Sequence, residues 1–155
     1  MKIELQDKAI LVTGSNSGIG FAIASELLNA GAKVALHYNA NSDGALSLEE
    51  QFPSQAKSFQ CDFSNSASIP GFFDQVLSWS DGLDVLINNA GMSIMNSIDN
   101  TDEEWVHNWN TIMNINLLSA GILSKKALEL FKKQSSGRII NIASRAAFRG
   151  DTPEY

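Results

Sequence analysis

Residues 9–20 read AILVTGSNSGIG, four apolar residues followed by three glycines in a Gly-x3-Gly-x-Gly spacing. The apolar run predicts a buried β-strand, and the positions of Phe21, Ile23 and Leu27 after the glycines predict an amphipathic helix. Glycines in such a strand-to-helix turn let backbone N–H groups and the positive end of the helix approach a pyrophosphate. The stretch therefore predicts a dinucleotide-binding loop. The alternative is a tight turn that binds no ligand.

Short apolar runs continue to alternate with helix-length amphipathic stretches along the chain. Further strands are expected at residues 33–36, 57–61, 83–87 and 138–143, and helices at about 18–30, 43–51, 66–80 and 102–133. Gly31 and Gly82 stand where two of these helices should end. The alternation predicts a parallel sheet with right-handed crossovers, in which the apolar first, fourth and fifth strands are covered by helices on both faces. Ligands of such sheets bind beyond the carboxyl ends of the strands.

Composition and charge exclude several classes of partner. Eleven Lys and Arg against seventeen Asp and Glu give a net charge of −6, so no broad cationic surface is expected to bind nucleic acid or membrane lipid. The single Cys61 has no disulfide partner within the chain, and one Cys with two His cannot form a zinc cage. No apolar run approaches the ~20 residues of a membrane span. We predict a single cytoplasmic domain over residues 1–155, with no metal.

Polar groups follow the fourth and fifth expected strands. The run Asn88-Asn89-Ala90-Gly91 offers two amides that can hold neighbouring backbone segments and two small residues that leave room for a flat ligand. Ser144 offers a hydroxyl for a substrate oxygen. Because the carboxyl ends of parallel strands share one edge, both groups should lie beside the glycine loop. The alternatives are an Asn-Gly-type turn for the first group and a capping or turn role for Ser144.

The expected helix at 102–133 combines a clear start with one anomalous position. Thr101 and Glu104 have the spacing of a capping box. An apolar stripe follows at helical spacing, through Trp105, Trp109, Ile112, Met113, Ala120, Leu123, Ala127 and Phe131. Asn116 interrupts this stripe, so it is expected to face the core. Since a buried amide is costly unless it is hydrogen-bonded, Asn116 indicates a polar network, with a purely structural role as the alternative.

Together these pieces resemble the short-chain dehydrogenase/reductase family, in its sub-type with the Gly-x3-Gly-x-Gly loop, from about residue 5 to residue 150. The matching pieces are residues 13–20, Asp62 after the third strand, residues 88–91, Asn116 before Leu117, and residues 141–144. The resemblance implies a doubly wound Rossmann fold with three layers, α/β/α, and five strands in the order 3-2-1-4-5. It also implies hydride transfer between C4 of the nicotinamide of NAD or NADP and a carbonyl or alcohol carbon.

The resemblance also implies roles for individual residues. Cofactor binding is expected of Gly14, Ser15, Asn16, Ser17, Gly18, Ile19 and Gly20, of Tyr38, of Asp62 with Phe63 beside it at the adenine, and of Asn88, Ala90 and Gly91. Two residues have catalytic roles: Asn116 holds a backbone and water relay, and Ser144 orients and polarises the substrate carbonyl. Tyr38 stands where an NAD enzyme carries an acid, which favours NADP over NAD although no Arg or Lys is nearby.

The resemblance covers the family domain only in part. Tyr155 lies upstream of the place where the family carries its proton-transferring Tyr and Lys, so it is interpreted as a substrate-loop residue in a C-terminally incomplete chain, with the acid/base itself as the alternative. The long helix commonly packs against its mate in this family, which implies a homodimer or homotetramer. The leading hypothesis is an NAD(P)-dependent reductase of a small or acyl-linked carbonyl. The alternatives are a non-catalytic dinucleotide-binding protein or remnant, and a nucleotide-binding domain unrelated to hydride transfer.

Overall fold

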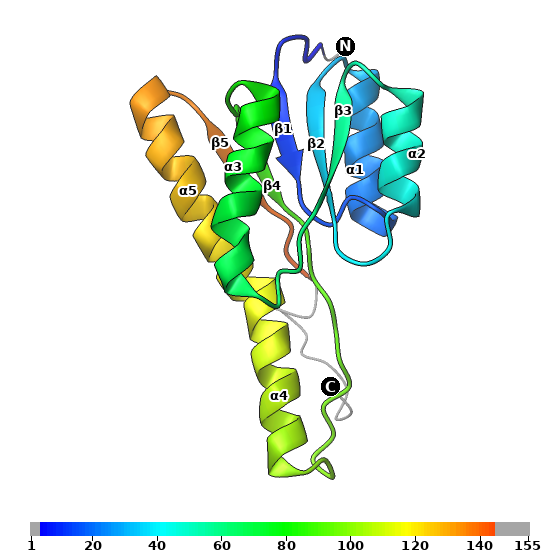
Figure 1. The fold of residues 1–155 in the computed structure, drawn as a ribbon, viewed down its shortest axis with the longest axis vertical. Coiled ribbons are helices and arrows are strands. Elements are labelled where there is room, and N and C mark those ends of the chain that lie inside the picture. The colour runs from blue at the N-terminus through cyan, green and yellow to red at the C-terminus, as the bar shows by residue number, and fades with distance from the viewer. Residues whose placement is uncertain (1–3, 145–155) are drawn as a thin grey trace.

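A computed structural model describes residues 4–144 as a five-stranded sheet flanked by helices. The strands are β1 (Ala9–Val12), β2 (Lys33–Tyr38), β3 (Ala56–Gln60), β4 (Val85–Asn88) and β5 (Arg138–Asn141). All neighbouring strands are parallel, and the order β3-β2-β1-β4-β5 confirms the expected one. Their carboxyl ends therefore share one edge of the sheet, which is the lower edge in Figure 1.

Helices lie on both faces of the sheet. α1 (Gly18–Asn29) and α2 (Asp43–Gln51) cover one face, and α3 (Ile69–Ser80) and α5 (Ser119–Gln134) cover the other (Figure 1). Along β1, Leu11 packs in the cluster beneath α3 and α5, whereas Ile10 and Val12 pack in the cluster beneath α1 and α2. Because both faces are covered, every residue of β1 is buried, which explains its continuous apolar run. The three-layer doubly wound architecture is confirmed.

The fifth strand differs from the prediction that both of its faces are buried. Arg138, Ile140 and Asn141 are exposed, with 38% of Ile140 accessible. α5 packs on one face of β5, but α1 and α2 lie mainly over β1, β2 and β3. Within residues 4–144, therefore, no helix covers the second face of β5, and its apolar side chains remain accessible.

Two expected helices are interrupted near the site edge. The one expected at 66–80 is a 3-10 turn, η1 (Ser66–Ser68), followed by α3. The one expected at 102–133 consists of α4 (Asp102–Met113), a π-helical turn, η2 (Asn114–Leu118), and α5. The predicted capping box of α4 is present: Glu104 N–H donates to Thr101 Oγ1, and Thr101 N–H donates to the Glu104 carboxylate. The π turn inserts an extra residue per turn, a feature often found at functional sites.

The glycines at the ends of the helices also differ slightly from expectation. Gly31 and Gly82 follow α1 and α3 with φ values of 94° and 122°. The left-handed residue at the C-cap of α3, however, is Asp81 (φ 60°), one position before Gly82. A short polar side chain tolerates this conformation better than most, so the helix ends before its glycine.

α4 projects beyond the sheet edge, as Figure 1 shows. Consequently the apolar stripe is buried only along α5, at Leu123, Ala127 and Phe131. On α4, Trp105, Trp109 and Met113 remain 37%, 49% and 37% exposed, because this helix extends past the sheet. The first half of the stripe is thus an accessible apolar surface.

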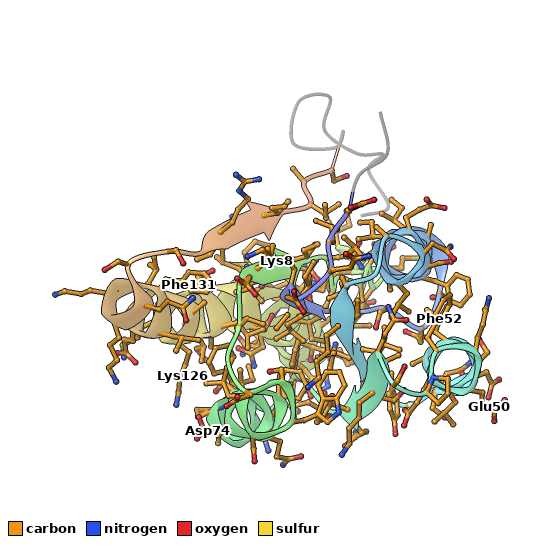
Figure 2. All side chains as sticks on the ribbon, turned by 90° about the horizontal axis from the view of Figure 1, so that it is seen from above. Lys8, Glu50, Phe52, Asp74, Lys126 and Phe131 are labelled. Atoms are coloured by element: carbon orange, nitrogen blue, oxygen red, sulfur yellow. The ribbon has the colours of Figure 1, made fainter. Side chains whose placement is uncertain are left out.

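Contacts between α3, α5 and their flanking loops fix how these elements reach the site edge. Lys126 Nζ of α5 lies 3.3 Å from Asp74 Oδ1 of α3 (Figure 2). This pair is largely exposed, so it stabilises the packing by at most about 1 kcal/mol. Nearer the site, Asn114 of η2 donates through Nδ2 to the backbone oxygen of Ser64, 3.0 Å away, which joins the π turn to the loop after β3.

Candidate functional site

The glycine loop after β1 packs directly against the segment after β4. Gly14 has φ +65°, and a Cβ added there would lie 2.9 Å from the Cα of Ala90. A Cβ added at Gly20, where α1 begins, would lie 2.1 Å from Gly14 O and 2.4 Å from Asn89 Nδ2. These two glycines therefore bring the two segments into contact, as the sequence predicts for groups at the same sheet edge.

Thr13 and Asn89 tie these segments together with hydrogen bonds. Thr13 is 1% exposed, and its Oγ1 accepts from the N–H groups of Asn89 and Ala90, both at 2.9 Å. Asn89 Nδ2 in turn donates to the backbone oxygens of Thr13 and Gly14, at 2.9 and 3.1 Å. The bonds of Asn89 are of the kind the sequence predicts, an amide that holds a neighbouring backbone segment, whereas the sequence pattern assigns Thr13 no role of its own. The available signal for Thr13 is a hydroxyl placed at the carboxyl end of a fully apolar strand.

The first turn of α1 has no side-chain cap. Ser17 occupies the N-cap position, but its side chain makes no hydrogen bond to the helix amides. Gly18 has φ +54°, and a Cβ added there would meet nothing within 4 Å in the described structure. Ile19 is 64% exposed. The positive end of α1 is therefore open, and an anion is the ligand that this arrangement favours.

Asn88 is the centre of a polar cluster at the end of β4. It is 7% exposed, and its Nδ2 donates to Asn141 Oδ1 at 2.8 Å and to Ser124 Oγ at 3.1 Å. Its own Oδ1 is buried and has no hydrogen-bond partner among residues 4–144. Buried acceptors are normally satisfied, so this oxygen is available to a donor from outside the described residues, a ligand included.

Asn116 differs from the prediction in its burial but not in its polar character. It is exposed rather than facing the core. Its side chain spans the backbone of Met92: Oδ1 accepts from the N–H at 2.9 Å, and Nδ2 donates to the carbonyl oxygen at 2.8 Å. The physical reason is that Asn116 lies in the π turn beside the loop after β4, where its partner is a loop backbone and not the sheet. Gly91, directly before Met92, is also exposed.

The residues after β2 and β3 lie farther along the same edge. Tyr38 is half-buried at the end of β2 and pairs with Gln60 of β3. Asp62 is exposed, and its Oδ1 accepts from Ser64 N–H at 2.9 Å, which shapes the turn after β3. Phe63 is only 3% exposed, so its ring supports the core instead of lining the edge.

His37 lies beneath the glycine loop, in a buried environment where both ring nitrogens have hydrogen-bond partners. It is 3% exposed and its ring stacks on Phe63, with 3.9 Å between centroids and an interplanar angle of 4°. Nδ1 lies 3.0 Å from Gly14 N, and Nε2 lies 2.9 Å from Cys61 O. Burial lowers the pKa of His37 from 6.5 to about 4, although the hydrogen bond to Cys61 opposes this shift. The ring is therefore neutral at pH 7.

Acidification is expected to destabilise the protein through His37. In the unfolded chain this histidine takes up a proton as the pH falls past 6.5, whereas the folded one stays neutral until about pH 4. The contribution is therefore complete above pH 6.5 and is lost between pH 6.5 and 4, by about 3 kcal/mol in total. Urea unfolding of the intact protein across this range, compared with His37→Asn, isolates the effect. Identical pH dependence in both proteins would contradict it.

The segment after β5 reaches the same edge. Asn141 pairs with Asn88, and Ile142 N–H donates to Asn88 O at 2.9 Å. Ser144 follows two residues later and is exposed. The expected substrate-loop residue Tyr155 lies outside the described residues.

Neither a metal cluster nor a membrane-spanning helix is found in the part of the chain that the structure describes. No group of three or more His, Cys, Asp or Glu side chains there is placed to hold a metal ion. No helix of this part is long and apolar enough to cross a bilayer.

A parallel sheet in the order β3-β2-β1-β4-β5, with an open glycine loop after β1, defines an α/β protein of the doubly wound class. The family model for short chain dehydrogenases matches residues 8–153. The chain belongs to this family, which confirms the resemblance seen in its motifs.

The proteins to which the chain is similar include reductases that are named for different substrates. The chain is 31% identical to the 3-oxoacyl-acyl-carrier-protein reductase of Aquifex aeolicus (strain VF5), an alignment that covers 97% of this chain and 61% of that protein. It is 33% identical to sorbose reductase of Schizosaccharomyces pombe, with 97% and 60% covered. A crystal structure of a short chain dehydrogenase from Burkholderia cenocepacia J2315 in complex with NADP has a TM-score of 0.83 at 29% identity, covering 96% of this chain and 60% of that one. The chain thus spans about three fifths of the length of these relatives.

Proposed function

We propose that the intact protein is an NAD(P)-dependent oxidoreductase that transfers hydride between the nicotinamide and a carbonyl or alcohol carbon. The observation that carries the proposal is the uncapped start of α1 at the carboxyl edge of the sheet, the edge at which β4 also ends in Asn88, whose buried Oδ1 has no partner among the described residues. An open helix N-terminus suits a pyrophosphate, and a buried acceptor suits a ribose hydroxyl. Family membership supports the same reaction.

In this proposal three segments of the described chain each bind a different part of the cofactor. The loop from Gly14 to Gly20 holds the pyrophosphate through backbone amides at the start of α1. Asn88, Ala90 and Gly91 line the ribose next to the nicotinamide, and the exposed Asp62 carboxylate accepts from the adenine amino group. Phe63 is not among the direct contacts, because its ring is buried against His37. The bound nicotinamide supplies the hydride chemistry.

Ser144 and Asn116 carry the catalytic roles in this proposal. The Ser144 hydroxyl donates to the substrate oxygen and so holds the carbonyl polarised. Asn116 fixes the loop after β4 by bonding both backbone groups of Met92, and it thereby orders the substrate side of the site. Tyr155 has the role of a substrate-loop residue in this proposal.

NADP is the cofactor form we favour. The β2 end carries Tyr38 where a carboxylate would repel a 2′-phosphate, so an anionic group is tolerated there. The Burkholderia cenocepacia relative is described with NADP bound. Both the 3-oxoacyl-acyl-carrier-protein and the sorbose reductase relatives fit a small or acyl-linked carbonyl as the substrate class.

Cofactor titration followed by turnover tests the function. The intact protein is titrated with NADPH and with NADH while tryptophan fluorescence is recorded, and cofactor oxidation is then followed with a set of 3-oxoacyl thioesters, ketoses and simple ketones. We expect saturable binding that is tighter for NADPH, and oxidation with at least one carbonyl class. Absence of binding to both dinucleotides by the folded protein would overturn the proposal, and binding without any turnover would overturn its enzymatic part.

We also propose a homodimer or homotetramer and a cytoplasmic location. Trp105 and Trp109 are stacked, with 5.2 Å between ring centroids, and both are accessible on α4 together with Val106 and Met113. Apolar surface of this kind on a projecting helix is typical of an interface. Sedimentation equilibrium of the intact protein tests the assembly, and a mass of one chain would contradict it. The free thiol of Cys61 suits a reducing compartment.

A further inference from the structure

His37 lies in β2, outside the glycine motif, and it links the glycine loop to the end of β3 through hydrogen bonds. Its side chain receives the N–H of Gly14, and its backbone oxygen receives both the N–H of Ser15 at 2.9 Å and the Ser15 Oγ at 3.1 Å. The other ring nitrogen contacts Cys61 O at the end of β3. One residue of β2 thus binds the first two amides of the loop.

The partners of the two ring nitrogens determine the tautomer of His37. Gly14 N is a donor, so Nδ1 must accept and carries no proton. Cys61 O is an acceptor, so Nε2 must carry the proton and donate. Phe63 stacks on the ring and Phe72 meets it edge-on, with centroids 5.2 Å apart, so the ring is packed on two sides in this orientation. The acceptor is therefore held at one fixed place beneath Gly14.

These contacts decide which loop amides remain for a ligand. Because the Gly14 and Ser15 amides are bonded to His37, they are withdrawn from any phosphate. The loop is then oriented so that the uncapped first turn of α1, at Gly18 and Ile19, faces outward. Gly14 must also keep its close approach to Ala90, so a shift of Gly14 would disturb both sides of the site.

We propose that His37 is a positioning residue for the dinucleotide: its neutral Nδ1 holds Gly14 and thereby sets the loop that binds the pyrophosphate. This inference rests on the proposed function and extends it to a residue outside the glycine motif. His37 contacts no cofactor atom in this proposal and acts only through Gly14 and Ser15.

Three substitutions separate the positioning role from general packing. His37→Asn keeps an acceptor near the Nδ1 position, His37→Gln keeps a donor near the Nε2 position, and His37→Leu removes both. NADPH dissociation constants and midpoints of thermal unfolding are measured on the intact protein and on each variant. We expect His37→Gln and His37→Leu to bind NADPH about tenfold more weakly, and His37→Asn to bind within about threefold of the wild type. The midpoint of thermal unfolding is expected to fall in all three variants, because each loses the stacked ring.

The outcomes distinguish this inference from the proposed function. If the wild type binds NADPH but the Asn and Gln variants bind it equally well or equally poorly, the positioning role is wrong and the proposed function stands. If the folded wild type binds neither NADPH nor NADH, the proposed function itself fails and the inference falls with it. Affinity that follows the acceptor while thermal stability does not would establish the role. The Asn and Gln pair decides the question even if His37→Leu does not fold.

Discussion

Gly20→Ala is expected to lower dinucleotide affinity by about 100-fold or more and to destabilise the protein by about 3 kcal/mol. A Cβ at this position would lie 2.1 Å from Gly14 O and 2.4 Å from Asn89 Nδ2, and contacts this short require the atoms to move. The first of these neighbours is backbone, so α1 and the loop must separate. Asn89 would then lose its bonds to Thr13 and Gly14, and the helix amides would leave their position at the sheet edge.

Gly121→Ala is the matched control for this substitution. Gly121 lies inside α5, and a Cβ there would meet nothing within 4 Å of the described residues. Alanine is a better helix former than glycine, so the control should be stabilised by up to about 1 kcal/mol and bind the cofactor as the wild type does. Urea unfolding and NADPH titration of both variants give the comparison. Near-wild-type affinity in Gly20→Ala would show that the loop tolerates a side chain there and that the close packing is not required.

The sheet and the glycine loop are the parts of the structure that the sequence predicts best. The run at residues 9–12 is apolar without a break, and the structure shows why: Leu11 faces one helical layer while Ile10 and Val12 face the other. The glycine spacing is equally informative, because two of its three glycines, Gly14 and Gly20, stand where a Cβ would collide with neighbouring backbone. In these cases a local pattern reports directly on a local physical requirement.

The features that the sequence does not predict depend on contacts between distant segments. His37 reads as an isolated histidine, yet it is bonded to Gly14 and Cys61, which are 23 and 24 residues away. Asn116 is expected to face the core because a regular helix would place it on the apolar stripe. The π turn and the backbone of Met92 give it an exposed position instead. Periodicity describes one element at a time, so it does not report how loops from different strands meet.

Burial along the stripe shows the same limit. Trp105 and Leu123 have equivalent places in the helical pattern, but Leu123 is fully buried and Trp105 is 37% exposed. The difference arises because α5 lies over the sheet and α4 extends past it (Figure 1). Whether an apolar stripe meets the core or a partner depends on where the helix lies relative to the sheet, which its own sequence does not encode.

Ser144→Ala in the intact protein is expected to lower kcat by about 10² to 10³, while the NADPH dissociation constant changes by less than about twofold. Asn141 pairs with Asn88, and Ile142 N–H continues the ladder to Asn88 O, so the chain leaves the sheet beside the proposed ribose contact. Ser144 follows there and is exposed. Its proposed role is a hydrogen bond to the substrate oxygen, and that bond strengthens as hydride arrives and negative charge develops on the oxygen.

The separation of kcat from cofactor affinity is the informative result for Ser144, because the pyrophosphate and ribose contacts lie in other segments. Ser144→Thr retains a hydroxyl and should recover a substantial part of the turnover, whereas Ser78→Ala, at an exposed position on α3, should match the wild type. Steady-state turnover at saturating NADPH, with fluorescence titration of the cofactor, measures both quantities. Full turnover in Ser144→Ala would remove the serine from the reaction, and a large loss of NADPH affinity would place it in the cofactor site instead.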